Sequence, residues 1–326
     1  MAILVTGGAG YIGSVVVERL INAGQRVVVL DNLSTGYRNA VHSDAEFVLG
    51  DIRDIPCLKH VFSHFDIDGV IHMAAKALIP ESITDPAPFY EINLSGGIKL
   101  IDTMATHGVR QIIMSSTAAV YGQPDCMPID ENTTTNPMNP YGETKLSFER
   151  MLYWYSQAYG FEATVFRYFS AAGASTHYGE AHVPETHLIP RLLLSALNGT
   201  SEAEIYGTDY DTPDGTCLRD FVHVIDLADA HIRALEVPNI SGFRVYNMGS
   251  GTGYSVLDVV NEVEKITGKK LQRRFLPRRN GDPARLLASS AKAISELEWK
   301  PAYQSLYDII VSAWNWHCRY PNGFQG

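Results

Sequence analysis

Short apolar runs alternate with longer segments of helical periodicity through the first half of the chain. Six of these runs are predicted as strands: residues 3–6, 26–30, 46–49, 69–72, 111–115 and 162–168. Several are almost continuously apolar, which is typical of strands that are buried on both faces of a parallel sheet. The alternation of strand and helix predicts an α/β fold with a doubly wound parallel sheet of the Rossmann type.

The alternation becomes less regular after Tyr168, where glycine, proline and charged residues gather in segments 173–184 and 207–215. We expect a second, smaller α/β lobe, which binds the substrate, to begin here. Residues 220–223, 224–235 and 243–248 are predicted as a strand, a helix and a strand that return to the large sheet, and residues 255–267 resume the small lobe. The predicted domains are therefore residues 1–168 plus about 220–249, and about 169–219 plus 250–326.

The first predicted strand runs directly into residues 6–13, TGGAGYIG, in which Gly7, Gly10 and Gly13 form a G-x-x-G-x-x-G pattern. Glycine lets a backbone approach a phosphate closely. A helix that starts near Tyr11 would point its positive N-terminus at a pyrophosphate. This glycine pattern, placed between a strand and a helix, predicts a dinucleotide-binding loop.

Two aspartates follow the next predicted strands. Asp31 ends the second strand, where a carboxylate accepts hydrogen bonds from a ribose 2′-hydroxyl and repels a 2′-phosphate, so the pattern favours NAD over NADP. The alternative is a tight glycine turn whose aspartate caps a loop. Asp51, after the third strand, is predicted to lie beside the adenine, although an aspartate in such a place is more often a turn residue.

The candidate chemistry lies on one predicted helix, on which Tyr141 and Lys145 are about one turn apart and share a face. A phenol titrates near pH 10 in model peptides, and a neighbouring ammonium lowers its pKa toward that of a usable general base. Tyr-x-x-x-Lys alone also fits an exposed helix face. Here it follows a helix-start signal at residues 139–140 and a strand that ends in SST at 115–117. The Thr117 hydroxyl is therefore predicted to face the ligand crevice of the sheet.

Composition narrows the range of partners. The chain has 326 residues, 45% hydrophobic and 19% charged, which is an ordinary globular composition at a length that favours two lobes. Its net charge of −10 disfavours binding to nucleic acid, because an acidic surface repels phosphate groups. An anionic substrate must then be held by a few placed cations.

Cysteine and histidine spacing predicts neither disulfides nor a metal site. The four cysteines are far apart: Cys57, Cys126, Cys217 and Cys318. This pattern fits the cytoplasm. His60 and His64 are four residues apart, but no carboxylate or thiol pattern completes them. We expect no export signal, and no membrane span because no apolar run approaches roughly 18 residues.

These residues together resemble the extended short-chain dehydrogenases/reductases and, within that superfamily, the UDP-glucose 4-epimerase family of NAD-dependent epimerases and dehydratases. The resemblance covers nearly the whole chain. It is carried by TGGAGYIGS, LDNLSTG, GDIRD, VIHMAA, SSTAAVYG, NPYGETK, FRYFSAAGA, PETHLIP, YGTDYDTPDGTCLRDFVHV, YNMGSG, SVLDVV and PRRNGDPARL. The DYDTPDGTCLRDFVHV segment is the most specific to the family.

The resemblance implies a catalytic set and a cofactor set. Tyr141 resembles the catalytic base and acid, Lys145 its partner, and Thr117 the assisting hydroxyl at a position where the family usually has Ser. The implied NAD contacts are Gly7, Gly10, Tyr11, Ile12, Gly13, Asp31, Asn32, Asp51, Ile52, Ala74, Ala75, Asn93, Ser115, Tyr141, Lys145 and Tyr168.

The implied contacts with a UDP-sugar come mostly from the second half of the chain. Arg219 and Arg279 match arginines that clamp the UDP pyrophosphate, a task that suits the fork of a guanidinium. For Arg279 the alternative is a solvated cluster with the arginines near it. Asp282 matches a contact with the uridine ribose. The full implied set is Thr117, Tyr141, Ser170, His187, Leu188, Tyr206, Arg219, Arg279 and Asp282.

Four positions depart from the family pattern. Ser170 stands where the family has an Asn, and His187 replaces an Asn found in some members. Ala77 stands where some members have a Lys near the cofactor. Leu286 matches a position that gates the pocket: a large Tyr there goes with exclusion of N-acetylated sugars and a small residue with their acceptance. Leucine is intermediate, so the range of sugars stays open.

The implied activity is the interconversion of UDP-glucose and UDP-galactose by transient oxidation at carbon 4, with tightly bound NAD and Tyr141 moving the proton. Four alternatives remain: an epimerase of a UDP-N-acetylhexosamine, UDP-glucuronate or a UDP-pentose; a nucleotide-sugar 4,6-dehydratase; a dehydrogenase that releases its oxidised product; and a non-catalytic nucleotide-sugar sensor. The dehydratase is disfavoured because Ala118 and Ala119 follow Thr117, where that branch has an Asp-Glu pair.

The resemblance also implies a homodimer. In this superfamily, helices that correspond to residues near 91–105 and 141–159 pair across a four-helix interface. The second segment is rich in aromatic residues, which would also suit a core. The partners implied are a UDP-sugar and a second copy of the chain, with no nucleic acid, membrane or metal.

Overall fold

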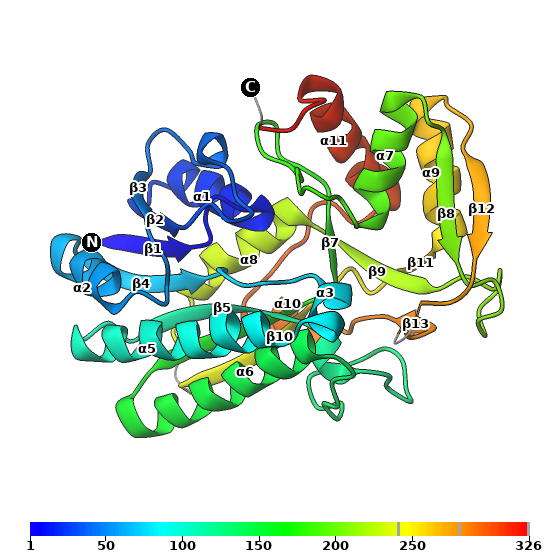
Figure 1. Cartoon of the computed structure of the whole chain (residues 1–326). Helices are drawn as coiled ribbons and strands as arrows, with labels where there is room; N and C mark the ends of the chain where they lie inside the picture. Colours follow the sequence, from blue (N-terminus) through cyan, green and yellow to red (C-terminus); the bar gives the residue numbers. More distant parts are fainter. Residues whose placement is uncertain (240–241, 280–281, 325–326) are drawn as a thin grey trace.

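The computed structural model describes residues 1–239, 242–279 and 282–324. Residues 280 and 281, in the middle of the PRRNGDPARL segment, lie outside this description. The core is a seven-stranded sheet of order β10-β6-β5-β4-β1-β2-β3, in which every neighbouring pair is parallel (Figure 1). Its strands are β1 (Ala2–Thr6), β2 (Val27–Asp31), β3 (Glu46–Leu49), β4 (Ile67–His72), β5 (Gln111–Thr117), β6 (Glu162–Tyr168) and β10 (Phe243–Met248).

All six strands predicted in the first half of the chain belong to this sheet, which confirms the α/β doubly wound class. The predictions for β3 and β6 match the observed bounds, whereas β5 runs two residues beyond its predicted end. The reason is pairing: Ser116 and Thr117 continue the ladder opposite Arg167 and Tyr168. Strand pairing thus carries the polar end of β5 to the edge where ligands bind in such sheets.

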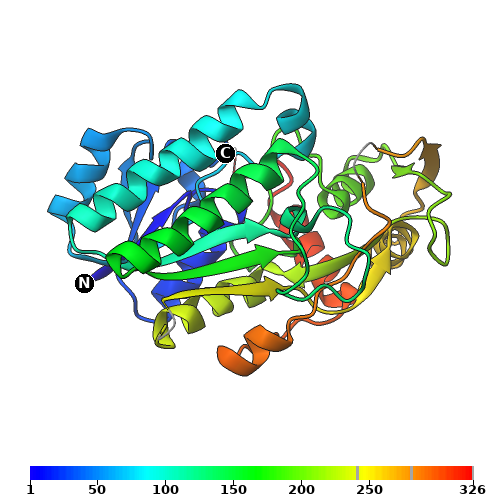
Figure 2. The ribbon, with the colours of Figure 1, turned by 90° about the horizontal axis from the view of Figure 1, so that it is seen from below.

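Helices cover both faces of the sheet (Figure 2). On one face α1 (Tyr11–Asn22) and α8 (Val224–Glu236) share an apolar core with the strands. On the other face lie α2 (Ile55–His64), α5 (Gly97–Thr106) and α6 (Pro140–Tyr159). A Cβ added at Gly97 would lie 2.5 Å from the Phe148 ring, so glycine allows α5 to approach α6 this closely.

Local sequence sets the bounds of α6, the helix that carries Tyr141 and Lys145. The Asn139 side chain caps its start by accepting a hydrogen bond from the Gly142 amide, with Pro140 at the first helical position. Gly160 ends the helix in a left-handed conformation at φ +67°. The helix-start signal at residues 139–140 is therefore confirmed.

The connections near the large sheet contain six short helices: η1 (Arg38–Ala40), α3 (Ile79–Thr84), α4 (Ala87–Phe89), the π-helix η2 (Tyr90–Gly96), η3 (Ala118–Tyr121) and α10 (Ala291–Glu296). The remainder of the chain forms β7 (Ser170–Ala172), α7 (Leu188–Asn198), β8 (Glu202–Tyr206), β9 (Leu218–His223), β11 (Gly253–Ser255), α9 (Val256–Thr267), β12 (Gln272–Leu276), β13 (Arg285–Leu286) and α11 (Leu306–Arg319). Helices α7, α9 and α11 enclose an apolar core of their own.

The sheet predicted for one strand is wrong. Residues 220–223 fall in β9, which pairs with β7, β11 and β13 in a four-stranded sheet and not with the large sheet. The edge next to β6 is occupied by β10, so no place remains there for β9. The helix and strand that follow, α8 and β10, do return to the large sheet as predicted. Among the described residues, no helix combines the length and the apolar character needed to span a bilayer.

Candidate active site

A cavity of about 910 Å³ opens at the carboxyl ends of the large sheet and extends toward the second sheet. Parallel sheets of this type bind ligands at this edge. Every cofactor position predicted from the sequence lines the cavity except Asn93, and so does every predicted substrate position. Gly7 and Asp282, which are 275 positions apart in the sequence, therefore line the same cavity.

The glycine loop between β1 and α1 requires glycine at two positions. Gly7 has φ +76°, and a Cβ there would lie 2.6 Å from the Ala74 amide nitrogen. A Cβ at Gly13 would lie 2.2 Å from the Gly7 carbonyl oxygen. Gly10 precedes α1 without a side-chain cap, so no side chain of this residue satisfies the first amides of the helix, and the first turn of α1 lines the cavity. This loop can bring backbone amides against a pyrophosphate.

Asp31, at the end of β2, holds the glycine loop and lines the cavity. Its Oδ2 accepts a hydrogen bond from the Ala9 amide at 3.0 Å, and its Oδ1 accepts one from the Leu33 amide at 2.8 Å. The carboxylate thus fixes the glycine loop, and it also lines the cavity. Burial raises the pKa of Asp31, and the two amide hydrogen bonds oppose that rise.

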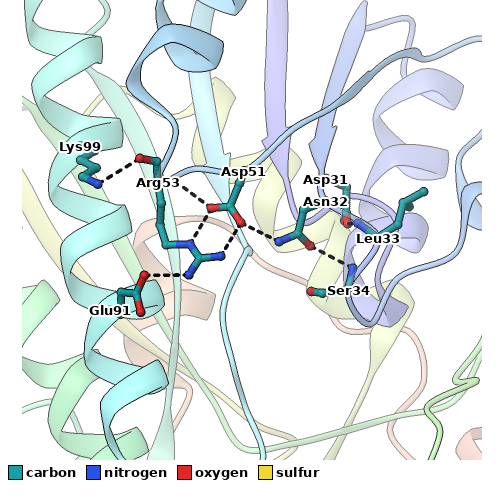
Figure 3. A network of polar contacts seen from close by, with 8 residues as sticks. All are labelled: Asp31, Asn32, Leu33, Ser34, Asp51, Arg53, Glu91 and Lys99. Carbon is teal, nitrogen blue, oxygen red and sulfur yellow. Dashed lines mark hydrogen bonds and ion pairs between the residues drawn. The ribbon is translucent and has the colours of Figure 1, made fainter.

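A polar network joins the ends of β2 and β3 (Figure 3). Asn32 donates to Asp51 at 2.8 Å, and Arg53 grips both oxygens of Asp51 at 2.9 and 2.8 Å. Arg53 also donates to Glu91 at 2.9 Å. The hydrogen bonds from Arg53 hold the pKa of Asp51 far below its usual range, so Asp51 presents a fixed negative charge to this end of the cavity. Arg53 is a cavity residue that the sequence analysis did not single out.

Tyr141 lies in the first turn of α6, and Thr117 at the end of β5 is close enough to favour its ionised form. The prediction that the Tyr141 pKa is lowered is wrong for the protein without a cofactor, in which only the chain's own groups act on the phenol. Burial raises the pKa of Tyr141 to about 12, and Thr117 only partly opposes this rise. The Lys145 ammonium donates a hydrogen bond to the Ser115 carbonyl on β5 at 2.8 Å.

Lys145 is 5% exposed, and burial lowers its pKa to about 8 even though Glu149 favours the charged form. Beside it, the Ser115 hydroxyl lies 2.9 Å from the Tyr168 hydroxyl, which lies 2.8 Å from Nε2 of His231. Burial lowers the pKa of His231 to about 4, so this imidazole is neutral at pH 7. His231 thus fixes Tyr168 from α8, a role that no sequence motif indicated.

Glu149, one turn beyond Lys145 on α6, belongs to a buried ion pair behind the site. Arg167 on β6 lies 2.7 Å from Glu149, and both side chains are under 10% exposed. The Ser116 hydroxyl also donates to Glu149, and Arg167 donates to Tyr121 at 2.8 Å. These contacts tie α6 to β5 and β6, and so fix the helix that carries Tyr141 and Lys145.

The far end of the cavity contains two arginines. Arg219 on β9 donates to the Pro283 carbonyl at 2.8 Å and forms an ion pair with Asp282 at 3.1 Å. The guanidinium of Arg279 stacks over the Tyr206 ring, 3.8 Å from its centroid, and lines the cavity. Arg279 is itself exposed, and its neighbour Arg278 turns to Tyr210 and Asp209 instead.

Three further predicted substrate positions come from β7 and from the loop before α7. Ser170 lies on β7, His187 precedes α7, and Leu188 begins that helix. Burial alone would lower the pKa of His187. Hydrogen bonds to Glu180 and Glu185 outweigh burial and raise it to about 10. His187 therefore presents a positive charge to the cavity.

Two residues lie away from the places expected for them. Asn93 does not line the cavity: it is 3% exposed and holds the Lys76 backbone through its own amide, at 2.8 and 3.0 Å. Leu286 packs on the apolar cluster around Tyr121 and Ile129, outside the cavity wall.

Lys76, one position before Ala77, lines the cavity and forms an ion pair with Glu81. Ala77 lines the cavity as well. Glu180 also lines the cavity, and no sequence pattern pointed to it.

His72, at the end of β4, is 2% exposed, and its Nδ1 lies 2.8 Å from the Thr6 hydroxyl. Burial lowers its pKa to about 3. Like His231, it is a neutral buried imidazole.

A doubly wound parallel sheet with a glycine loop after β1, together with a Tyr-x-x-x-Lys helix that faces a strand-end hydroxyl, defines a dinucleotide-dependent enzyme of the short-chain dehydrogenase/reductase type. Comparison with known sequences specifies the family. The chain belongs to the NAD dependent epimerase/dehydratase family, whose model matches residues 3–249.

Several relatives match along their whole length. The UDP-glucose 4-epimerase of Lacticaseibacillus casei is 48% identical over 327 residues, covering 99% of both chains. A crystal structure of a UDP-glucose 4-epimerase superposes with a TM-score of 0.97 at 46% identity over 100% of both chains. The UDP-glucose 4-epimerase of Bifidobacterium longum, solved with NAD+ and UDP, has a TM-score of 0.94 at 36% identity, covering 99% of this chain and 100% of that one.

Proposed function

We propose that this chain interconverts UDP-glucose and UDP-galactose by reversible oxidation at carbon 4 of the hexose, with NAD kept bound throughout. The observation that carries the proposal is the position of Tyr141. Tyr141 and Thr117 line the same cavity as the glycine loop and the two predicted arginines, Arg219 and Arg279. A cofactor at one end and a nucleotide at the other would present a sugar to Tyr141.

The chain's own residues fit NAD. The loop around Gly7 and Gly13 has no room for a Cβ, which suits the close approach of a pyrophosphate. Asp31 offers a carboxylate to an adenosine ribose, and Asp51 keeps its charge beside it. When bound, NAD supplies the acceptor and then the donor of the hydride exchanged with carbon 4, and its oxidised ring is positively charged.

Under this proposal Tyr141 removes the proton of the sugar 4-hydroxyl. It later returns the proton to the oxygen on carbon 4, once that carbon has the opposite configuration. Thr117 favours the ionised form of Tyr141 and would orient its oxygen. Burial raises the pKa of Tyr141, so the buried phenol needs positive charge to become a base. Lys145 supplies part of that charge from the next turn of the helix, and the oxidised nicotinamide ring would supply the rest.

We propose that Arg219 and Arg279 hold the UDP pyrophosphate while the hexose turns between two orientations. The stacking of Arg279 on Tyr206 and the ion pair of Arg219 with Asp282 fix both guanidiniums in the cavity wall. The nucleotide would be held rigidly and the sugar loosely. Either face of carbon 4 could then turn toward the nicotinamide ring of NAD. The expected contacts of Ser170, His187 and Leu188 belong to this proposal too.

An epimerase is favoured over a dehydratase by the residues that follow Thr117. Ala118 and Ala119 form the start of η3 and offer no group that could move a second proton, as loss of a hydroxyl from carbon 6 requires. The part of the cavity beside Tyr141 thus carries the groups for one proton transfer, namely Tyr141, Lys145 and Thr117.

We propose that the chain acts as a homodimer that associates through α5 and α6. The outer face of α6 exposes Trp154, Tyr159 and Tyr153 by 67%, 57% and 42%. Large apolar side chains gathered on one exposed helix are typical of an interaction surface. We also propose a cytoplasmic location, which is supported by four cysteines that are all free.

The test of the function uses purified protein incubated with UDP-galactose, with no added reductant. We expect chromatography to show UDP-glucose approaching equilibrium, with no rise in free NADH absorbance. A panel of UDP-glucuronate and N-acetylated UDP-hexoses should turn over more slowly. Accumulation of free NADH would indicate a dehydrogenase, and binding without turnover of any UDP-hexose would indicate a sensor.

Tyr141→Phe tests the assigned base directly. Loss of the phenol oxygen should lower kcat by about 10²–10⁴, the usual contribution of a positioned general acid–base. The control is Tyr159→Phe, on the exposed end of the same helix, which should leave kcat unchanged. Near-full activity of Tyr141→Phe would exclude the role given to Tyr141.

A further inference from the structure

The loop between β7 and α7 brings together two glutamates and two histidines. One ligand atom from each of Glu180, His182, Glu185 and His187 lies within 4.8 Å of the other three. Oε1 of Glu180 is 2.9 Å from Nδ1 of His182 and 2.7 Å from Nδ1 of His187. Oε1 of Glu185 is 2.9 Å from the same nitrogen of His187. The four residues have neither a helical nor a CxxC-type spacing, so no sequence pattern indicated this cluster.

The four side chains are divided between the interior and the cavity. The glutamate side chains are 7% and 8% exposed, whereas those of His182 and His187 are 31% and 49% exposed. Oε2 of Glu185 is buried with no hydrogen-bond partner, one of two such side-chain atoms among the described residues. A buried carboxylate oxygen without a partner is unfavourable. A cation held between the carboxylates and the imidazoles would remove this cost.

We propose that Glu180, His182, Glu185 and His187 bind one divalent transition-metal ion of the zinc type. Imidazole nitrogen and carboxylate oxygen are the donors that such ions accept, at about 2.0–2.2 Å. Donors around a tetrahedral ion at that range are about 3.3–3.6 Å apart. The three direct contacts of 2.7–2.9 Å would therefore lengthen, and any pair near the 4.8 Å limit would move closer. Two imidazoles make magnesium or calcium unsuitable, since these ions take oxygen ligands. The ion would displace the protons of the N–H···O contacts and release them.

The site opens into the cavity already described, since Glu180, His182 and His187 line it. His187 is one of the side chains expected to contact the UDP-sugar. A metal ion on its imidazole would draw that side chain away from the sugar nucleotide. We therefore expect the bound ion to raise the KM for UDP-galactose. This consequence depends on the proposed function, whereas the metal binding itself does not.

The experiment is a calorimetric titration of the NAD-loaded full chain with ZnCl2. It is made in a Cys126→Ser, Cys318→Ser background, because both thiols are exposed and would themselves bind zinc. We expect one equivalent of Zn²⁺ per chain, with proton release seen as a dependence of the heat on buffer, and no binding of MgCl2. Glu185→Gln and His182→Gln should each weaken binding at least about tenfold. The control is His60→Gln with His64→Gln, a stacked pair on α2 that should leave binding unchanged.

The proposal is overturned if the parent shows no stoichiometric zinc binding, or if the His60 and His64 control weakens binding as much as the cluster variants do. Circular dichroism and NAD content check that each variant is folded. Glu185→Gln keeps the shape of the side chain, and His182→Gln changes a partly exposed one, so two independent variants test the same ligand set. An unchanged KM for UDP-galactose at saturating Zn²⁺ would overturn the inhibitory consequence.

Discussion

Nη2 of Arg219 lies 3.1 Å from Oδ1 of Asp282, across 63 residues of sequence. From the sequence, the two were expected to hold different parts of a UDP-sugar, the pyrophosphate and the ribose. In the folded chain the two side chains bind one another. The other terminal nitrogen of Arg219, Nη1, donates hydrogen bonds to the Leu218 and Pro283 carbonyls. Asp282 thus sets the direction in which Arg219 faces the cavity.

Asp282→Ala should therefore weaken substrate binding through Arg219. We expect the KM for UDP-galactose to rise by about tenfold, because a charge-assisted hydrogen bond contributes about 1.5–3 kcal/mol, while kcat changes little. Steady-state kinetics that separate kcat from KM check this. The matched control is Asp209→Ala, which breaks the exposed pair of the neighbouring Arg278. A fall in kcat at constant KM would contradict the positioning role.

The buried ammonium of Lys145 should make stability depend on pH. Burial lowers its pKa from 10.5 to about 8. Between pH 8 and 10.5 the unfolded chain therefore binds a proton that the folded chain does not, so the free energy of unfolding rises with pH in this window. Relative to Lys145→Met, the unsubstituted chain should gain up to about 1.4 kcal/mol per pH unit. Urea unfolding of both proteins at pH 8 and 9.5 measures the difference, and parallel pH dependences would contradict the assignment.

The Glu149–Arg167 pair should be costly to break. Glu149→Gln leaves the Arg167 guanidinium buried without its counter-charge, and we expect a loss of about 3–5 kcal/mol in the free energy of unfolding. Glu236→Gln is the control, since the Arg233–Glu236 pair on α8 is exposed and should contribute under about 1 kcal/mol. Equal losses of stability in the two variants would show that burial does not determine how much each ion pair contributes to the free energy of unfolding.

Gly13→Ala should expel the cofactor. The added Cβ would lie 2.2 Å from the Gly7 carbonyl oxygen, and the loop must shift to admit it. We expect the purified variant to retain no NAD, measured as nucleotide released on denaturation. Gly24→Ala is the control: it places alanine at φ +79° with no atom within 4 Å, so it should cost about 1–2 kcal/mol of stability and retain NAD.

The exposed aromatic face of α6 should mediate association. Trp154→Lys, at a side chain 67% exposed, should convert the proposed dimer to a monomer, as seen by light scattering after size-exclusion chromatography. Tyr307→Lys on α11 changes an aromatic residue of similar exposure, 51%, and should leave the mass unchanged. A monomeric parent protein, or a dimeric Trp154→Lys variant, would exclude this interface.

Much of the large sheet could be predicted from local pattern. The runs that became β3 and β6 were predicted with their observed bounds, because strands buried on both faces are apolar along their length. The Asn139 cap and Gly160 likewise fix α6 through interactions within a few residues. Gly13 follows the same logic, since its added Cβ would meet the loop itself, whereas at Gly7 the Cβ would meet Ala74, which is distant in sequence.

The sequence by itself therefore determined the fold class, the glycine loop and the helix that carries Tyr141 and Lys145, because periodicity, capping and turn geometry act over short stretches of chain. Only the tertiary structure decided that β9 leaves the large sheet, that Asn93 supports the Lys76 backbone, and that Glu180 meets His187. It also decided the electrostatics of Tyr141, since burial raises a pKa that an adjacent lysine alone would lower. Pairing partners, burial and the direction of side chains depend on segments far apart in sequence, and no local pattern encodes them.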